Sequence, residues 1–398
     1  MRLCLFTDTL ADINGVSRFI RSIADQAPAL GRDLQIITST RLECPPRDNI
    51  HNVRPVYARA MPGYPELELV WPDVRSIMRL ADSLRPDVVH VSTPGPVGLA
   101  GRRFAKLRGV PLVGTYHTDF PAYIDHLFCD RSLTWLTAQA MRRFYRTFDR
   151  LFTRSTDYMR AMGRLGISAD RIVRLLPGID TDTFHTRHRD PSVWTGFPGI
   201  RKADVKVLYV GRVSIEKNLP MLAGAWKIAT AADPTLHLVI IGDGPYRSAM
   251  ETQVRGEVAG AEAEVGGRTS FLGFRHGDEL SRLYASADLF VFPSTTDTLG
   301  QVVMEAQSSG LPVIVTDQGG PSEVVNHCEG VDQSGIVLPA DNPARWASEI
   351  VRLAGNPELR ARLGAAGHRK IQSMSIRCSF EHFWQIHENT LHRHLTKS

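Results

Sequence analysis

The chain has 398 residues, 43% of them hydrophobic and 22% charged, which suits a soluble protein of two domains and provides no apolar run long enough to span a membrane. Its five cysteines are scattered without a CxxC pair, so a disulfide framework or a cysteine zinc site is not expected, and a reducing cytoplasm fits. The net charge of +5 arises in residues 1–185, with 25 basic and 19 acidic side chains, and either an anionic partner or an ordinary solvated surface accounts for it.

Both halves of the chain repeat a short apolar strand, a turn and a longer amphipathic helix. The first half has predicted strands at 2–7, 34–38, 87–91, 111–115, 148–153 and 172–175. The second half has them at 205–210, 236–241, 269–272, 288–292, 312–315 and 335–338. This alternation predicts an α/β protein with two doubly wound parallel sheets, whose ligands bind beyond the carboxyl ends of the strands.

The expected domain boundary lies in residues 186–204, which contain Pro and Gly, lack periodicity and are predicted to form a linker. Residues 1–185 then form the first domain and residues 205–374 the second. Apolar side chains recur at helical spacing in residues 375–398, so a final helix is expected there.

Two loops of the first domain carry candidate site residues. Asn14 and Gly15 form a turn directly before a helix, whose free N–H groups would cradle a phosphate. His117 follows the strand at 111–115 and is expected at the carboxyl edge of the sheet. An ordinary strand–helix turn and a structural histidine are the competing interpretations.

The loops of the second domain suit a nucleotide diphosphate. Arg212 and Lys217 flank the turn that follows the strand at 205–210, so two cations and a helix N-terminus converge there. A surface salt-bridge cluster would also explain them. Tight loops at the same sheet edge, whose backbone would meet a nucleobase, contain Gly242, Gly273, Phe274 and Arg275.

Two carboxylates lie eight residues apart in the segment 292–306. Asp297 precedes a helix predicted to start near Leu299 and Gly300, and Glu305 lies inside that helix. Carboxylates accept hydrogen bonds from sugar hydroxyls, so the pair is expected to bracket a sugar nucleotide.

Together these segments resemble the retaining glycosyltransferases of family 4, also called glycosyl transferases group 1, which have the GT-B fold. The resemblance covers nearly the whole chain. Its motifs arrive in the family's order: Asn14-Gly15-Val16, His117, Pro177-Gly178-Ile179-Asp180, Gly211-Arg212 with Lys217, Gly242-Asp243-Gly244-Pro245, and the acidic motif that ends at Glu305. It implies two Rossmann-like domains facing a deep cleft, with the C-terminal helix crossing back to the first domain.

The resemblance also implies a role for each matched residue. Arg212 and Lys217 would bind the donor diphosphate, with the Gly15 backbone approaching from the other domain. Glu305 would accept hydrogen bonds from the ribose, and His117 would contact the donor sugar near the reacting centre. The remaining donor contacts would come from Gly242, Gly273, Phe274, Arg275, Asp297, Leu299 and Gly300. Gly319 and Gly320 would shape the pocket beneath the sugar and phosphates.

One residue departs from the family pattern, because Asp297 stands where the motif usually has Glu. The run Asp297-Thr298-Leu299-Gly300 looks like that of the sulfoquinovosyl- and mannosyltransferase-like lipid glycosyltransferases. It therefore favours a lipid-linked acceptor, for which Asp119 and Tyr123 are the candidate contacts.

The implied activity is transfer of a hexose from GDP-mannose or a UDP-hexose to a lipid-linked or other glycan acceptor, with retention of configuration. No metal cofactor is expected, because Arg212 and Lys217 would offset the leaving-group charge and no DxD motif lies in a suitable loop. A nucleotide-sugar epimerase of the same fold and a non-catalytic binding subunit are the alternatives. A dehydrogenase is not expected, since GxGxxG is lacking. The donor sugar, base, acceptor, linkage and oligomeric state stay open.

The basic segment Arg142–Arg160 suggests a peripheral contact with anionic lipid on the inner face of the membrane. A solvated helix face with a buried aromatic stripe explains the segment as well. No nucleic-acid partner is expected, because no recognised binding signature accompanies these arginines.

Overall fold

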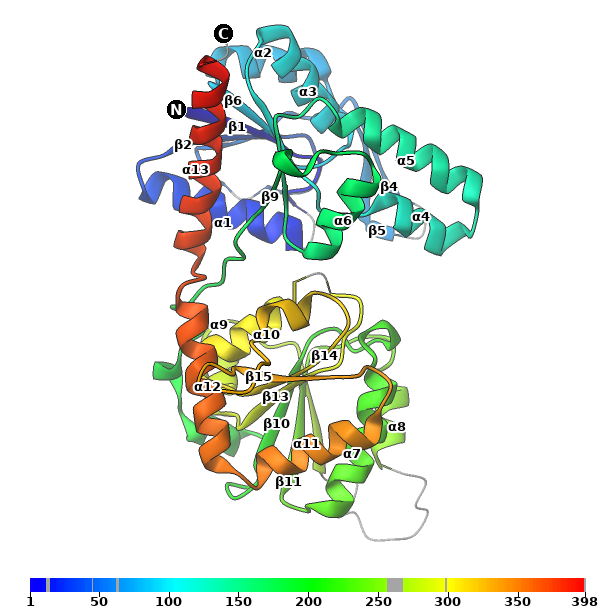
Figure 1. Cartoon of the computed structure of the whole chain (residues 1–398), viewed down its shortest axis with the longest axis vertical. Helices are drawn as coiled ribbons and strands as arrows, with labels where there is room; N and C mark the ends of the chain where they lie inside the picture. Colours follow the sequence, from blue (N-terminus) through cyan, green and yellow to red (C-terminus); the bar gives the residue numbers. More distant parts are fainter. Residues whose placement is uncertain (12–14, 45, 62–63, 256–267, 298, 397–398) are drawn as a thin grey trace. The chain divides into compact units, whose positions relative to one another are not determined.

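The computed structural model describes the chain except residues 12–14, 45, 62–63, 256–267, 298 and 397–398. The described chain divides into two compact units, one made of residues 1–178 with 376–398 and the other of residues 179–375 (Figure 1). Each unit is a parallel sheet with helices on both faces, which confirms the predicted fold class.

The first unit is built on a parallel sheet in the order β3-β2-β1-β6-β7-β8-β9. Its strands are β1 (Arg2–Phe6), β2 (Asp33–Thr38), β3 (Ile50–Asn52), β6 (Val88–Val91), β7 (Leu112–Thr115), β8 (Arg150–Thr153) and β9 (Ile172–Arg174). Alternate residues of β1 face opposite cores, with Leu5 on one side and Phe6 on the other. Burial on both faces explains the continuous apolar strands in the sequence.

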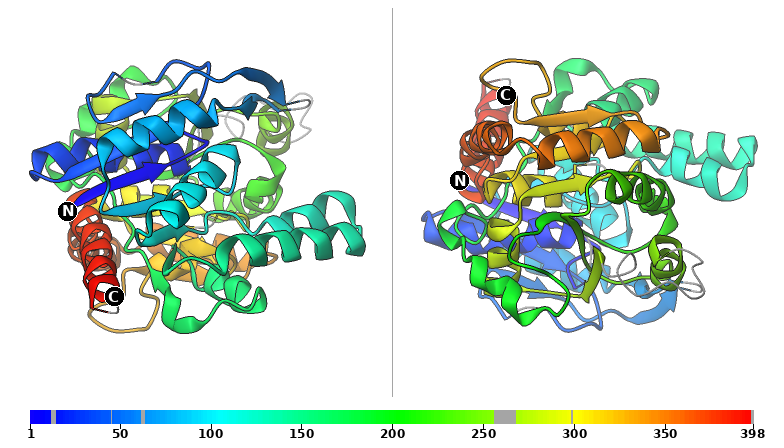
Figure 2. Two further views of the ribbon diagram at one scale, coloured as in Figure 1. Left: turned by 90° about the horizontal axis from the view of Figure 1, so that it is seen from above. Right: turned by 90° about the horizontal axis from the view of Figure 1, so that it is seen from below.

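In the described part of residues 1–178, six α-helices and a hairpin accompany this sheet. The helices are α1 (Gly15–Ala29), α2 (Val74–Leu84), α3 (Pro96–Arg108), α4 (Phe120–Phe128), α5 (Arg131–Tyr145) and α6 (Thr156–Arg164). The hairpin pairs β4 (Tyr57–Met61) with β5 (Tyr64–Trp71) in antiparallel fashion and was not predicted. The α4–α5 pair projects beyond the sheet of its own unit (Figure 2).

The C-terminal helix α13 (Ile376–Leu395) packs on the first unit, as predicted. Phe380, Phe383 and Trp384 are buried in one of its cores. His387 donates from Nδ1 to its own helix, and its Nε2 lies 3.0 Å from Nδ1 of His90 on β6. The helix is therefore part of the core of this unit.

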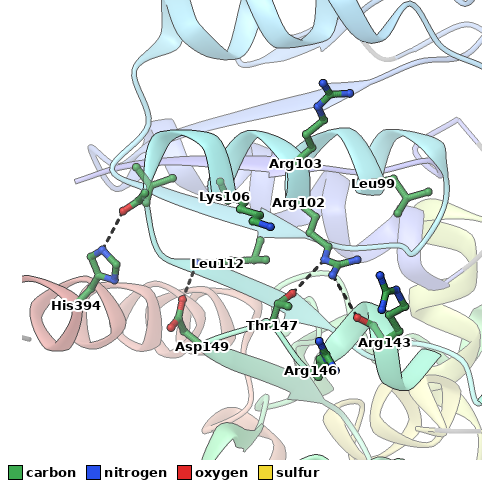
Figure 3. Close-up of a pocket in the computed structure, with 13 residues that line it drawn as sticks. Leu99, Arg102, Arg103, Lys106, Leu112, Arg143, Arg146, Thr147, Asp149 and His394 are labelled. Atoms are coloured by element: carbon green, nitrogen blue, oxygen red, sulfur yellow. Dashed lines mark hydrogen bonds between the residues drawn. The ribbon is translucent and has the colours of Figure 1, made fainter. Parts of the chain in front are cut away.

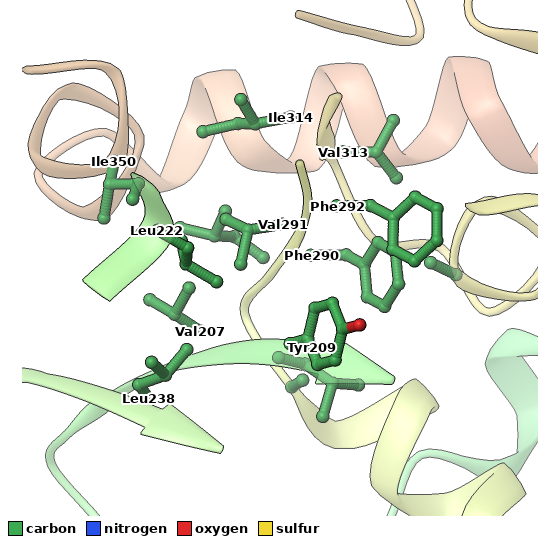
Figure 4. Close-up of a cluster of buried hydrophobic side chains, with 14 of the residues drawn as sticks. Val207, Tyr209, Leu222, Leu238, Phe290, Val291, Phe292, Val313, Ile314 and Ile350 are labelled. Carbon is green, nitrogen blue, oxygen red and sulfur yellow. The ribbon is translucent and has the colours of Figure 1, made fainter. Parts of the chain in front are cut away.

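The second unit has a six-stranded parallel sheet in the order β12-β11-β10-β13-β14-β15. Its strands are β10 (Val205–Val210), β11 (Leu236–Ile241), β12 (Thr269–Gly273), β13 (Leu289–Phe292), β14 (Val313–Thr316) and β15 (Gly335–Leu338). Its helices are α7 (Leu219–Ala232), α8 (Arg247–Arg255), α9 (Gly277–Ser286), α10 (Gln301–Ser308), α11 (Pro343–Ala354) and α12 (Pro357–Gln372). Figure 4 shows its core, where Val207, Tyr209 and Phe290 pack between sheet and helices.

The expected linker at 186–204 belongs to the second unit. It contains the short 3-10 helices η2 (Thr186–His188) and η3 (Pro191–Gly196). Trp194 is buried in the core, and its Nε1 donates to the carbonyl of Ser286 at 3.0 Å. The chain instead leaves the first unit at Gly178. Pro and Gly content suggested a free linker, but one buried tryptophan fixes the segment on α9.

Candidate active site

The loops after β10 and β13 meet at the point where the strand order of the second sheet reverses. β10 lies between β11 and β13, so the order reverses there, and doubly wound sheets bind ligands at such a point. Lys217, in the 3-10 turn η4 (Ile215–Lys217), donates from Nζ to Oδ2 of Asp297 at 2.8 Å. The two side chains are 19% and 29% exposed, so the ion pair is only partly shielded from water.

The Asp297 loop is held from several directions. Ser294 Oγ donates to the same Oδ2 atom that Lys217 contacts. The carbonyl of Asp297 accepts the N–H of Gly320 at 2.8 Å, and Thr296 Oγ1 donates to the carbonyl of Glu216 at 3.3 Å. The loops after β10, β13 and β14 are thus joined around the ion pair. A Cβ at Gly319 would lie 2.8 Å from the same Asp297 carbonyl, which explains the glycine there.

The Arg212 side chain is exposed beside this loop, but its backbone is held in place by a buried residue. The hydroxyl of buried Tyr209 donates to the Arg212 carbonyl at 2.9 Å. Burial raises the pKa of Tyr209, with the charge of Asp297 adding to the effect, so the hydroxyl stays a donor. The Arg212 side chain is therefore presented to solvent from a rigid turn.

Glu305 lies on α10 and is only 4% exposed. Tyr284 donates its hydroxyl to Oε2 of Glu305 at 3.0 Å, an anchoring contact that the sequence did not reveal. Gly300 is the N-cap of this helix with φ 69°, and a Cβ there would lie 2.9 Å from Cα of Pro321. Leu299 packs against the core, and Thr298 of the same motif lies outside the described residues.

The glycine loops at the end of the sheet stack closely on one another. The N–H of Gly242 donates to the carbonyl of Gly273 at 2.8 Å, and a Cβ on Gly242 would lie only 2.0 Å from the carbonyl oxygen of Gly211. Phe274 is 65% exposed beside them. The guanidinium of Arg275 is engaged by Glu279 at 3.4 Å.

A pocket of about 690 Å³ lies at the carboxyl edge of the first sheet. Its polar end comes from the loops after β1, β6 and β7, and its apolar end from α4 and α5. The lining residues are Asp8, Thr9, Val16, Glu68, Ser92, Thr93, Pro94, Gly95, His117, Thr118, Phe120, Ile124, Thr137, Met141 and Tyr145. The pocket is thus polar at one end and apolar at the other.

His117 lines the polar end, as its position after β7 predicted. Its Nε2 lies 3.1 Å from Oγ of Ser92. Burial, with the nearby charge of Arg154, lowers the pKa of His117 to about 3. The imidazole is therefore neutral at physiological pH, and it can donate or accept a hydrogen bond without carrying charge.

Asp8 also lines the pocket and was missed as a site residue. Its carboxylate accepts the N–H of Val97 at 2.7 Å and of Gly98 at 3.2 Å, which caps the N-terminus of α3. Burial raises the pKa of Asp8 against the lowering effect of these bonds. Its position directly after β1, beside the loop after β6, was the signal available in the sequence, because the strand order reverses at β1.

Asp119 and Tyr123 do not line this pocket. Asp119 caps the N-terminus of α4, accepts the hydroxyl of Tyr116 at 3.1 Å and pairs with Arg164 at 3.5 Å. Tyr123 is 45% exposed on α4. Gly15 is the first residue of α1, and Asn14 lies outside the described residues.

The described residues contain no group of three or more His, Cys, Asp or Glu side chains placed to hold a metal ion. Nor does any helix in the described part of the chain have both the length and the apolar character that crossing a bilayer requires.

Comparison with curated proteins finds relatives that match along most of both chains. A GDP-mannose-dependent alpha-mannosyltransferase of Mycolicibacterium smegmatis is 31% identical over 380 residues, which cover 93% of this chain and 92% of the relative. One of Mycobacterium tuberculosis is 30% identical, covering 83% and 81%. A sulfoquinovosyl transferase of Arabidopsis thaliana is 28% identical, covering 91% of this chain but 66% of that longer protein.

Solved structures share the fold at lower identity. HepE of Anabaena, solved in complex with UDP, superposes with a TM-score of 0.71 at 17% identity, covering 97% of this chain and 99% of that one. A sucrose-phosphate synthase of Thermosynechococcus elongatus gives 0.72 at 18% identity, covering 98% of both. The family models for glycosyltransferase family 4 and for glycosyl transferases group 1 match residues 13–183 and 194–370. The chain therefore belongs to the family 4 (group 1) glycosyltransferases and is a hexosyltransferase with the GT-B fold.

Proposed function

We propose that this enzyme transfers a hexose from a nucleotide-diphosphate sugar to a lipid-linked or other glycan acceptor, with retention of configuration. GDP-mannose is the first candidate donor, because two relatives of at least 30% identity are named for it. A UDP-hexose is the second candidate.

The ion pair between Lys217 and Asp297 is the observation that carries the donor site. It sits at the reversal of strand order, where doubly wound sheets bind ligands, next to the exposed Arg212. When a diphosphate enters, Lys217 exchanges the Asp297 carboxylate for a phosphate oxygen, and Arg212 binds a second oxygen. Asp297 is thereby released to accept hydrogen bonds from the sugar hydroxyls.

Transfer then needs one bond to break and one to form at the anomeric carbon. The bond from that carbon to the diphosphate oxygen breaks, and its electron pair stays on the leaving phosphate. An acceptor hydroxyl bonds to the same face of the carbon and gives its proton to that phosphate, so the configuration is retained. Arg212 and Lys217 stabilise the developing charge, so no metal is required. Neutral His117 hydrogen-bonds the sugar without adding charge.

The pocket of the first unit supports an acceptor with both polar and apolar parts. Its polar end, at His117, suits a hydroxyl-bearing head group. Its apolar end, formed by Phe120, Ile124 and Met141, suits a hydrocarbon chain. A lipid-linked acceptor matches both ends, whereas a free sugar would fill only one.

A peripheral membrane contact would present the same acceptor. The segment Arg142–Arg160 is proposed for it, although Arg154 takes no part, because its guanidinium lies over the ring of Phe19 at 4.3 Å. On α5, Trp135 and Leu136 are 60% and 57% exposed in the first half of the helix, whose last turn carries Arg142 and Arg143. Exposed apolar and basic side chains on one helix favour an interfacial contact.

The test is a transfer assay with GDP-mannose and UDP-glucose, each with and without a membrane lipid extract, in EDTA. We expect a glycolipid product with GDP-mannose whose anomeric configuration, read by NMR, is retained. Lys217→Met should abolish this product, whereas Lys227→Met, which changes an exposed lysine on α7, should not. An epimerised free sugar nucleotide formed without lipid would favour the epimerase. Loss of product in EDTA that Mg²⁺ restores would refute metal independence.

A further inference from the structure

A second pocket, of about 630 Å³, lies on the first unit at the opposite edge of the sheet from His117. It is bordered by the amino ends of β7 and β8, where Leu112 and Asp149 lie, by α3, by the end of α5 and by His394 of α13 (Figure 3). His117 follows the carboxyl end of β7. The pocket is therefore separate from the acceptor pocket described above, and its role goes beyond sugar transfer.

Basic side chains dominate this pocket. Arg102 and Lys106 come from successive turns of α3, and Arg143 and Arg146 from the end of α5. Among the described residues, none of these four is paired with a carboxylate. Arg103 also borders the pocket, but its side chain extends to the other side of α3 (Figure 3).

The one acidic lining residue is committed elsewhere. Asp149 accepts the N–H of Leu112 at 2.8 Å, and it lies toward the His394 end of the pocket (Figure 3). His394 in turn donates from Nε2 to the carbonyl of Gly109 at 2.9 Å. At the arginine end, no lining carboxylate pairs with the cations.

The guanidinium of Arg102 is held in place before any ligand binds. Its Nε donates to Thr147 Oγ1 at 3.0 Å, its Nη2 donates to the carbonyl of Arg143 at 3.2 Å, and the group lies 5.5 Å over the ring of Phe144. Burial lowers the pKa of Arg102, and the charges of Arg143 and Arg146 lower it further. These cations repel one another, so a bound anion would relieve the repulsion.

We propose that this pocket binds a phosphate monoester through Arg102, Lys106, Arg143 and Arg146. A dianion matches several converging cations better than a singly charged diester does. The volume exceeds what a lone phosphate fills and lies in the range of pockets for small metabolites, so the ester carries a group of glycerol or sugar size. The source is either a soluble ester or a lipid head group, since Leu99 at the rim is 50% exposed.

The test measures binding to the full chain in two arms. Glycerol 3-phosphate, followed by titration calorimetry, represents a soluble ester. Phosphatidylcholine vesicles that contain phosphatidic acid represent a lipid, and matched phosphatidylglycerol vesicles present a diester. The variant is Arg102→Gln with Arg146→Gln. The control, Arg75→Gln with Arg79→Gln on α2, makes the same change in net charge outside the pocket.

We expect saturable binding in at least one arm, weakened about tenfold or more by the pocket variant and less than about twofold by the control. Binding of glycerol 3-phosphate alone identifies a soluble ligand, and selective binding of phosphatidic acid vesicles identifies a lipid. No saturable binding in either arm, an equal loss in the control, or equal binding of phosphatidylglycerol vesicles overturns the proposal.

Donor binding is measured on the same proteins to separate this inference from the proposed function. The pocket variant should bind GDP like the wild type. Lys217→Met should leave glycerol 3-phosphate binding unchanged, because Lys217 lies in the second unit. If no nucleotide binds the wild type, the donor site is refuted while the phosphate result still stands.

Discussion

Breaking the ion pair from its two sides should have different effects on nucleotide binding. Lys217→Met removes the cation, and Asp297→Asn removes only the charge of its partner. Both lose a 2.8 Å contact between side chains that are 19% and 29% exposed. Exposed pairs contribute up to about 1 kcal/mol, and breaking a buried pair costs about 3–5 kcal/mol, so we expect a loss of about 1–2 kcal/mol of stability in each variant.

Nucleotide affinity should then separate the two variants. Lys217→Met loses a charged hydrogen bond to the diphosphate, which contributes about 1.5–3 kcal/mol, so the Kd for GDP should rise about 10- to 150-fold. Asp297→Asn frees Lys217 from its competitor, so the Kd should stay constant or fall by up to about 30-fold. Turnover of the sugar donor should nevertheless fall, because Asp297 is proposed to contact the sugar.

Titration calorimetry with GDP and UDP, alongside thermal unfolding, measures both quantities. Lys227→Met on α7 serves as the control for removal of a lysine. Equal weakening of nucleotide binding in Lys217→Met and Asp297→Asn would refute the reasoning, because the pair would then act only as a support for the two loops.

Three further changes test the structure. Burial lowers the pKa of His387 to about 4 from 6.5, so the unfolded chain binds more protons than the folded chain between these pH values. The free energy of unfolding should therefore fall as pH drops below 6.5, and it should fall less steeply in His387→Gln. Urea titrations at pH 7 and pH 5 measure both. Gly242→Ala places a Cβ 2.0 Å from the carbonyl oxygen of Gly211 and should lower the melting temperature strongly. The control Gly163→Ala should not, because nothing lies within 4 Å of a Cβ there. Equal melting temperatures for the two variants would contradict the close approach. Trp384→Ala should cost about 3–5 kcal/mol in urea unfolding, and a loss below 1 kcal/mol would show that α13 is not part of the core.

The sheets could be predicted from the sequence because buried parallel strands are continuous apolar runs. All predicted strands are present, and the structure adds β3 and the β4–β5 hairpin. The hairpin escaped prediction because its outer residues, including Tyr57 and Trp71, are largely exposed and do not form an apolar run. The prediction of a linker was wrong for a related reason, because the burial of Trp194 depends on α9, which is distant in the sequence.

The candidate site was predictable to the level of loops but not of contacts. An apolar pattern shows where a strand ends, so the sequence could predict the loops that carry Arg212, Lys217, Asp297 and His117. The pairing of Lys217 with Asp297 joins residues 80 positions apart and depends on side-chain geometry. The hydrogen bond from the Tyr284 hydroxyl to Glu305 likewise depends on the packing of two helices.

The first unit is discontinuous along the chain, and this affects the order in which the protein can fold during synthesis. Residues 179–375 are contiguous and can complete their own core as soon as they leave the ribosome. Residues 1–178 emerge earlier but wait for Phe380, Phe383 and Trp384, which fill a core they share. The apolar surface of this core therefore stays exposed until α13 has been synthesised. A chain truncated near residue 375 would keep that surface exposed, and chaperones and proteases would bind it.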